Sequence, residues 1–310
     1  MAQPKIIFMG TPPLAATILQ ALCEKGYNPV AVITQPAKAQ GRGHKVMPSA
    51  VEQYARTQDL NVMEVGDVNA PMTVDALKSY HPDLILVAAF GQILRIPILN
   101  MAKIACLNVH GSLLPKYRGA APIQRAIMDG ETITGITIQK MAMKLDTGDI
   151  LLQKKTRILP EETSGELMQR MSSLGAEALV EAVQLIESGK YSFVPQDESQ
   201  ATYAKKLDKS ESDLDWSKTA TQLYNAIRGL QPWPVAQTKI GTENLRIFKA
   251  EVLSKKLAPA QTDSDSKTYL HVGTGDGALG LLEVQLENRK RLPIAEFLRG
   301  LHEPLPKTLG

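Results

Sequence analysis

The sequence has little cysteine: Cys23 and Cys106 are the only two among 310 residues, and they form no paired motif. A disulfide framework and a zinc site built on cysteines are therefore excluded. No run of about eighteen apolar residues occurs, so no membrane span is expected. The first residues do not form a signal peptide, because Gly10, Pro12 and Pro13 interrupt a short apolar run. We expect a cytoplasmic protein that does not contact membranes.

Aromatic residues make up only 5% of the chain, which argues against a surface of stacked aromatic side chains for single-stranded nucleic acid. An excess of one charge is also lacking, since 35 Lys and Arg face 32 Asp and Glu. Nucleic-acid binding must therefore come from local clusters of cations. The apolar share of 44% is ordinary for a globular protein, and the length predicts about two domains.

Short apolar runs alternate with helical patterns in the first half of the chain. Strands are expected at residues 6–10, 30–33, 61–63, 83–89 and 104–109, and helices at 14–25, 48–57 and 72–80. This alternation is typical of βαβ units around a mostly parallel sheet. Two extended runs, 134–141 and 150–158, are expected to pair as a hairpin-like extension of that sheet. Thr163 and Glu166 form a capping-box pattern that predicts a helix to about Ser188.

Beyond Gly189 the sequence becomes polar and loses its periodicity. One helical pattern follows at 219–228, with extended runs at 235–240, 245–253, 269–272 and 279–286. We therefore predict a Rossmann-like α/β catalytic domain with a mostly parallel sheet over residues 1–189. A linker over 190–209 and a small OB-like β-barrel domain over 210–310 are expected to follow.

Two glycine-containing loops could suggest nucleotide binding. In the first, Gly10-Thr11-Pro12-Pro13, two prolines remove backbone donors, which argues against a nicotinamide cofactor. The second, residues 275–280, has the G-x-G-x-x-G pattern but lies between two expected strands with no helix after it. We interpret it as a turn, because Asp-Gly is a strong hairpin signal.

His110 directly follows an expected strand, at the end where open α/β sheets place their ligand crevice. Alternation puts Asn108 on the same face, and an amide beside an imidazole suits oxyanion stabilisation and proton movement. Asp146 lies in a polar turn between the two extended runs. A carboxylate brought next to the imidazole would favour its charged form and orient it. No histidine has the spacing of a zinc site, so no metal is expected.

These residues belong to longer motifs: Asn108, His110-Gly111-Ser112-Leu113-Leu114-Pro115, Tyr117-Arg118-Gly119 and Leu145-Asp146-Thr147-Gly148. Together they resemble the signature of the folate-dependent formyltransferases. The resemblance extends to Gly10-Thr11-Pro12, Gln35-Pro36, Gly41-Arg42-Gly43, Met47-Pro48-Ser49, residues 119–125 and Pro232-Trp233-Pro234. It covers the chain from end to end and is strongest toward the members that formylate an aminoacyl-tRNA.

The resemblance implies roles for particular residues. The family's catalytic residues fall on Asn108, His110 and Asp146, and its folate contacts on Ser112, Leu113, Leu114 and Pro115, with a cis peptide at Leu114–Pro115. Its pterin pocket is expected to use backbone near Phe90, Gly91, Gln92 and Ile93. The implied co-substrate is 10-formyltetrahydrofolate, with no metal and no covalent enzyme intermediate.

The family contains several acceptors, so the fold alone does not identify the substrate. Pro12, Pro13 and the second domain argue against an enzyme that formylates glycinamide ribonucleotide. A formyltransferase of amino-sugar nucleotides is the alternative, and it should lack the segment 35–49. A protein that only binds RNA would leave Asn108, His110 and Asp146 unexplained.

Segment 35–49 carries Lys38, Arg42, His44 and Lys45, and no acidic residue occurs between Glu24 and Glu52. A run of cations is most often a solvated face, but beside the crevice this one favours RNA contact. We expect a mobile arm that orders on initiator methionyl-tRNA. Arg42, Lys45 and Lys206 are the candidate tRNA contacts, and the protein is expected to act as a monomer.

Overall fold

The computed structural model describes residues 3–40, 45–301 and 303–310, without the side chains of residues 38–40 and 45. The chain divides into two compact units. The first comprises Met1–Gly119, Ile133–Arg157 and Met168–Ala204, and the second Ala120–Thr132, Ile158–Leu167 and Lys205–Gly310. These bounds differ from the expected domains, and the expected linker is divided between the units. The reason is that β11 (Tyr203–Ala204) pairs with β8 (Arg118–Gly119) inside the first unit.

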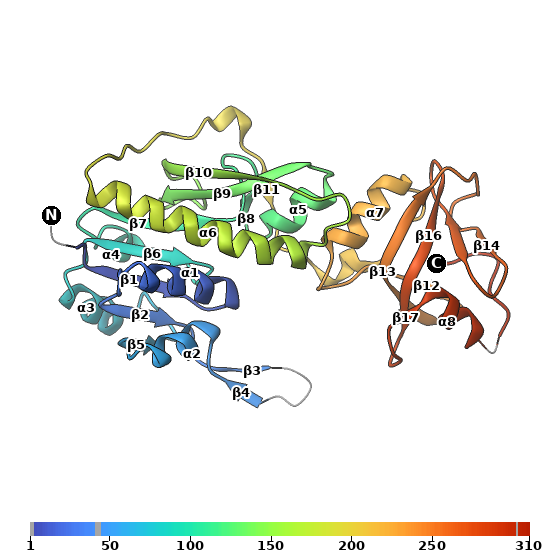
Figure 1. The fold of residues 1–310 in the computed structure, drawn as a ribbon, viewed down its shortest axis with the longest axis horizontal. Coiled ribbons are helices and arrows are strands. Elements are labelled where there is room, and N and C mark those ends of the chain that lie inside the picture. The colour runs from blue at the N-terminus through green and yellow to red at the C-terminus, as the bar shows by residue number, and fades with distance from the viewer. Residues whose placement is uncertain (1–2, 41–44, 302) are drawn as a thin grey trace. The chain divides into compact units, whose positions relative to one another are not determined.

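A seven-stranded sheet forms the centre of the first unit (Figure 1), in the order β10-β9-β7-β6-β1-β2-β5. Its strands are β1 (Ile6–Gly10), β2 (Ala31–Thr34), β5 (Val62–Glu64), β6 (Leu84–Ala88), β7 (Ala105–His110), β9 (Ile133–Lys140) and β10 (Ile150–Arg157). The five strands from β5 to β7 are parallel, whereas β9 and β10 are antiparallel to their neighbours. The predicted mostly parallel sheet and its hairpin extension are confirmed.

Helices cover both faces of this sheet. They are α1 (Pro13–Glu24), α2 (Ala50–Thr57), α3 (Pro71–Ser79), α4 (Ile96–Leu99) and α6 (Ser164–Glu187). On one face Val109 and Ile136 lie against Gly175 of α6. On the other face Cys106 clusters with apolar residues of α3 and α4. Successive residues of β7 therefore point to opposite layers, and His110 shares the face of Cys106 rather than that of Val109.

Local signals in the sequence account for where these elements begin. Strands β1 and β6 are buried over their whole length, as continuous apolar runs of a covered parallel sheet should be. Helix α1 has proline at its first position, and Ser49 caps α2 by accepting the N–H of Glu52 at 3.0 Å. Glu166 accepts the backbone N–H of Thr163 at 2.8 Å, which confirms the predicted capping box of α6.

The buried thiol of Cys106 is unreactive. Burial raises its pKa to about 12, so it stays protonated and is a poor nucleophile at neutral pH. Cys23 is also a free cysteine. The absence of a disulfide between the two agrees with the unpaired pattern in the sequence.

The segment expected to form an arm contains two short strands. β3 (Lys38–Gln40) and β4 (Lys45–Met47) pair antiparallel, with Lys38 opposite Met47. Residues 41–44, which include the predicted contact Arg42, lie outside the described residues.

The second unit is built on an antiparallel sheet in the order β12-β13-β16-β15-β14, with β17 paired to β16. Its strands are β12 (Gln237–Ile240), β13 (Glu243–Leu253), β14 (Thr262–Ser264), β15 (Leu270–Gly273), β16 (Ala278–Leu286) and β17 (Leu292–Pro293). Its helices are α5 (Pro122–Met128), α7 (Ala220–Gly229) and α8 (Ile294–Arg299), and the short 3-10 helices are Glu198–Gln200 in the first unit and Lys209–Ser212 in the second. The predicted fold class is confirmed as an α/β domain followed by a half-barrel of antiparallel strands.

The G-x-G-x-x-G string forms a hairpin turn between β15 and β16, as predicted, with Gly273 paired to Ala278. Its Asp276 carboxylate accepts the N–H of Ala220 at the start of α7, at 2.7 Å. The turn therefore orients a helix of the half-barrel unit, and the helix that would follow a dinucleotide-binding loop is replaced by β16.

Candidate active site

Polar side chains gather on one face of β7 and β9. Pairing of the two strands places Gln139 opposite Asn108 and Thr137 opposite His110. Directly paired residues of antiparallel strands point to the same side of the sheet. The four side chains therefore form a polar patch that continues the apolar face to which Cys106 belongs.

His110 lies between a backbone carbonyl and a carboxylate. Its Nε2 is 2.9 Å from the carbonyl oxygen of Tyr117, and its Nδ1 is 3.6 Å from Oδ1 of Asp146. A carbonyl oxygen only accepts hydrogen bonds, so Nε2 carries a hydrogen and Nδ1 is left to gain or lose a proton. The side chains of His110 and Asp146 are only 6% and 9% exposed, so water screens their interaction weakly.

The carboxylate of Asp146 is held by hydrogen bonds on both oxygens. Oδ2 accepts the backbone N–H of Gly119 at 2.9 Å, and Oδ1 accepts the side-chain amide of Gln139 at 2.8 Å. Asp146 has a φ of +54°, a left-handed conformation that aspartate tolerates better than most residues. The structure thus brings Asn108, His110 and Asp146 together, although they come from a strand and a distant loop.

Two glycines allow this close packing. Gly119 has a φ of +120°, and a Cβ there would lie 2.6 Å from the carbonyl oxygen of Ala204. At Gly148 a Cβ would lie 1.6 Å from the carbonyl oxygen of Lys140. Neither position has room for a side chain, so glycine is required for the loop to reach the polar face.

One hydroxyl group fixes the loop that follows His110. Thr137 donates its Oγ1 hydrogen to the carbonyl of Ser112 at 2.7 Å and accepts the N–H of Leu114 at 3.1 Å. Gln153 of β10 donates to the same hydroxyl at 3.0 Å and to the carbonyl of Leu114 at 2.8 Å. Ser112 and Leu114 are buried, Leu113 and Pro115 are partly exposed, and the Leu114–Pro115 peptide is cis as predicted.

The stretch Phe90–Ile93 lies where the order of the parallel strands reverses, between β1 and β6. The carbonyl of Phe90 accepts the Thr11 hydroxyl at 3.1 Å and the Gln35 amide at 2.7 Å. Gln92 accepts the N–H of Val68 at 2.8 Å. The backbone predicted to line a pterin pocket is therefore held at a topological switch point, where such sheets bind ligands.

Asn108 has a free amide in this arrangement. Among the described residues none forms a hydrogen bond with its side chain, which is partly exposed. An unpaired amide next to an imidazole is available to a ligand, whereas His110 and Asp146 are already oriented by the protein.

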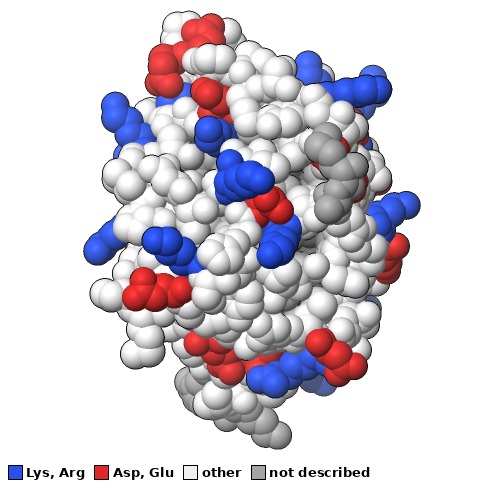
Figure 2. Space-filling model, turned by 90° about the vertical axis from the view of Figure 1, so that its left-hand side faces the viewer, with Lys and Arg blue, Asp and Glu red and all other residues white. Residues whose placement is uncertain are grey.

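The expected tRNA contacts are only partly described. Arg42 and the side chain of Lys45 lie outside the described residues, and the backbone of Lys45 begins β4. Lys206 is exposed in the second unit, where its carbonyl accepts Arg125 at 3.4 Å. Figure 2 shows basic and acidic side chains interspersed over the face that it presents, with no continuous patch of one sign.

Sequence reasoning missed Gln139, Thr137 and Gln196 as members of the site. For the first two a signal was present, because both are polar residues that alternate with Ile136 and Ile138 along the strand. Gln196 had no such signal, since it lies in a polar segment that we interpreted as a linker. Its two hydrogen bonds to the loop of Asp146 depend on tertiary contacts alone.

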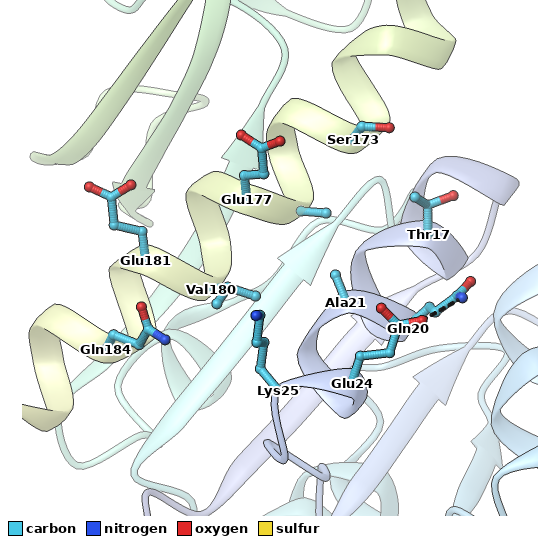
Figure 3. A pocket seen from close by; sticks show the side chains of 11 residues that line it. Thr17, Gln20, Ala21, Glu24, Lys25, Ser173, Glu177, Val180, Glu181 and Gln184 are labelled. Atoms are coloured by element: carbon cyan, nitrogen blue, oxygen red, sulfur yellow. Dashed lines mark hydrogen bonds between the residues drawn. The ribbon is translucent and has the colours of Figure 1, made fainter.

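A second concave region lies apart from this site. A groove of about 710 Å³ runs between α1 and α6, with Glu24 and Lys25 on one side and Glu177 and Glu181 on the other (Figure 3). It opens on the face of the sheet opposite to His110 and contains none of the predicted site residues. Among the described residues there is also no cluster of three His, Cys, Asp or Glu suited to a metal, and no helix long and apolar enough to cross a membrane.

Comparison with known proteins agrees with this geometry. Residues 4–183 match the formyl transferase family, and residues 206–302 match the formyl transferase C-terminal domain. A methionyl-tRNA formyltransferase of Geobacter sulfurreducens is 42% identical over 310 residues, covering 100% of this chain and 98% of that one. One from Agathobacter rectalis is 39% identical over 96% of this chain and 97% of its own length.

Among solved structures, an N-formyltransferase from Helicobacter canadensis in complex with folinic acid and dTDP-3-aminofucose has a similar fold. Its TM-score is 0.69 at 18% identity, covering 92% of this chain and 100% of that chain. At this identity the likeness concerns the fold.

Replacing Thr137 tests the role of its hydroxyl. Thr137→Val should lower the free energy of unfolding by about 1–3 kcal/mol, because the N–H of Leu114 and the amide of Gln153 lose their acceptor inside the protein. Thr137→Ser keeps the hydroxyl and should lower the free energy of unfolding by less. Urea unfolding followed by far-ultraviolet circular dichroism measures both. Equal losses in the two variants would contradict the assignment of the effect to the hydroxyl.

Proposed function

The chain belongs to the formyl transferase family, and we propose that it transfers the formyl group of 10-formyltetrahydrofolate to the amino group of methionyl-initiator tRNA. The observation that carries the chemistry is the convergence of Asn108, His110 and Asp146 beside two backbone segments suited to a folate. Full-length likeness to proteins named methionyl-tRNA formyltransferase supports the acceptor.

The reaction is a displacement at a formyl carbon. The neutral amine of the methionyl group attacks this carbon, and the electron pair of the C=O bond moves to oxygen. When the tetrahedral intermediate collapses, the bond to N10 of the folate breaks and N10 receives the proton that the amine loses. The protein must therefore stabilise one oxyanion and move one proton.

His110 suits both tasks because one ring nitrogen is hydrogen-bonded to Tyr117 and the other lies beside Asp146. Its Nε2–H is directed to Tyr117, so a proton taken up by the imidazole must be placed on Nδ1, next to the carboxylate of Asp146. The resulting imidazolium and the free amide of Asn108 stabilise negative charge on the formyl oxygen. Asp146 stabilises the imidazolium and fixes the orientation of the ring.

The folate occupies the two held backbone segments. Ser112, Leu113, Leu114 and Pro115 contact the co-substrate beside His110, and the pterin ring binds along Phe90, Gly91, Gln92 and Ile93. Both segments are fixed by hydrogen bonds from neighbouring strands and loops, so they are organised before the co-substrate binds.

The tRNA is bound by cations outside this pocket, with Arg42, Lys45 and Lys206 as the contacts. The protein acts as a monomer in the cytoplasm, where translation begins. One catalytic site in one chain suffices for a reaction of two substrates, and the proposed catalytic and folate-binding residues all come from the first unit.

A comparison of acceptors tests the proposed function. Purified protein with 10-formyltetrahydrofolate should formylate methionyl-initiator tRNA, and should leave glycinamide ribonucleotide and an amino-sugar nucleotide unmodified. Mass spectrometry of each acceptor measures the added formyl group. Transfer to the amino sugar alone would replace the proposed function by the alternative that shares this fold.

The catalytic roles predict large losses of turnover on mutation. His110→Ala and Asp146→Ala should each lower kcat by about 10²–10⁴-fold, the usual contribution of a positioned proton-transfer group. Circular dichroism should show that both variants fold. Near-normal turnover in either variant would remove that residue from the mechanism.

The ionic contact of Arg42 with tRNA should depend on salt. Arg42→Ala should raise the KM for tRNA and leave that for the folate unchanged, and its effect should shrink as the salt concentration rises. Arg56→Ala is the matched control, because the Arg56 guanidinium already pairs with Glu52 at 2.8 Å. Equal effects on both substrates would place Arg42 in support of the pocket instead of the RNA.

A further inference from the structure

The segment after α6 returns to the active site and contacts the loop of Asp146. It is attached first by Val194, which exchanges two backbone hydrogen bonds of 2.8 Å with Ile150 at the start of β10. Two residues later the side-chain amide of Gln196 donates to the carbonyl of Asp146 at 2.9 Å and to that of Gly148 at 2.7 Å. Both hydrogens of this amide are thereby used on one turn.

The other end of the Gln196 side chain is fixed by a buried arginine. Its Oε1 accepts Nε and Nη2 of Arg118 at 3.1 and 2.8 Å. Arg118 is fully buried, and its two terminal nitrogens also donate to the carboxylate of Glu198 at 2.9 and 2.7 Å. These hydrogen bonds raise the pKa of Arg118 and lower that of Glu198, so both groups are charged at neutral pH.

Arg118 is also next to the catalytic residues along the chain. Its neighbour Gly119 donates its N–H to Asp146, and its neighbour Tyr117 accepts from His110. The guanidinium of Arg118 therefore anchors both His110 and Asp146. It acts through the backbone of residues 117–119, which contacts both side chains, and through Gln196, which contacts the Asp146 turn. An arginine side chain in solvent could not fix the positions of these residues in this way.

We propose that Gln196 is a positioning residue for the formyl transfer: anchored by Arg118, it clamps the Asp146 turn so that the carboxylate faces His110. The inference rests on the proposed function, and Gln196 itself lies outside the motifs that identify the family. The left-handed backbone of Asp146 is a conformation that surrounding contacts help to maintain. The Gln196 amide supplies two of those contacts.

Gln196→Glu removes the hydrogen bonds that one end of the side chain makes and keeps those of the other end. The carboxylate keeps the length and still accepts Arg118, but it has no hydrogens for the carbonyls of Asp146 and Gly148. We expect kcat to fall about 10- to 100-fold, the scale of a small misplacement of a catalytic group, with the KM for tRNA within about twofold. Gln200→Glu is the matched control, because Gln200 is exposed and its side chain bonds Asp197 alone among the described residues.

A double-mutant cycle with Asp146→Asn distinguishes positioning from general support. If Gln196 acts through Asp146, then Gln196→Glu should lower kcat by less than about threefold when Asp146→Asn is already present. Single-turnover assays with excess enzyme measure the slow rates that this cycle requires. Equal losses in both backgrounds, or unchanged kcat in Gln196→Glu, would overturn the proposal.

The outcome can be separated from that of the proposed function. Wild-type protein that fails to formylate methionyl-tRNA contradicts the function, whatever the variants do. Wild-type protein that formylates it, together with a Gln196→Glu variant of equal kcat, contradicts only the positioning role. Equal urea midpoints of wild type and variant confirm that the comparison is made between folded proteins.

Discussion

The buried carboxylate of Asp146 is the group around which the site is arranged. A carboxylate that is nine-tenths buried must be paired or hydrogen-bonded, because water no longer solvates it. Here the partners are the N–H of Gly119, the amide of Gln139 and the imidazole of His110. Each of these belongs to a different strand, so the need to satisfy one charge brings the ends of β7 and β9 and the short strand β8 to the same place.

The sheet explains why those segments meet on this face. Strand β7 is the last of five parallel strands, and β9 pairs with it in the opposite direction. Asn108 and His110 therefore face Gln139 and Thr137 across a single pair of strands. Around Cys106 the neighbouring side chains are apolar and pack as a core. Around Asn108 and His110 they are polar, and hydrogen bonds take the place of that packing.

The environment on each side of the ring sets what His110 can do. A backbone carbonyl fixes the hydrogen on Nε2, and the carboxylate lies beside Nδ1, so the two nitrogens have different roles. Hydrogen bonds also fix the neighbouring loops. The Thr137 hydroxyl holds the loop after His110, and Gln35 and Gln92 hold the loop at the switch point. Organisation before binding is what a displacement at a carbonyl carbon needs, since the oxyanion forms only briefly.

The sequence alone determined the elements whose signals are local. Continuous apolar runs predicted β1 and β6, a capping pattern predicted the start of α6, and Pro12 with Pro13 argued against a dinucleotide loop. The motif around His110 identified the family and predicted Asn108, His110 and Asp146 as the catalytic residues. Only the tertiary structure decided that Gln139 and Gln196 hold Asp146, and that the polar segment after α6 contacts the site before the chain enters the second unit. The physical reason is that these hydrogen bonds follow no repeat: Gln139 is 7 positions from Asp146 and Gln196 is 50, and their geometry exists only after the sheet has formed.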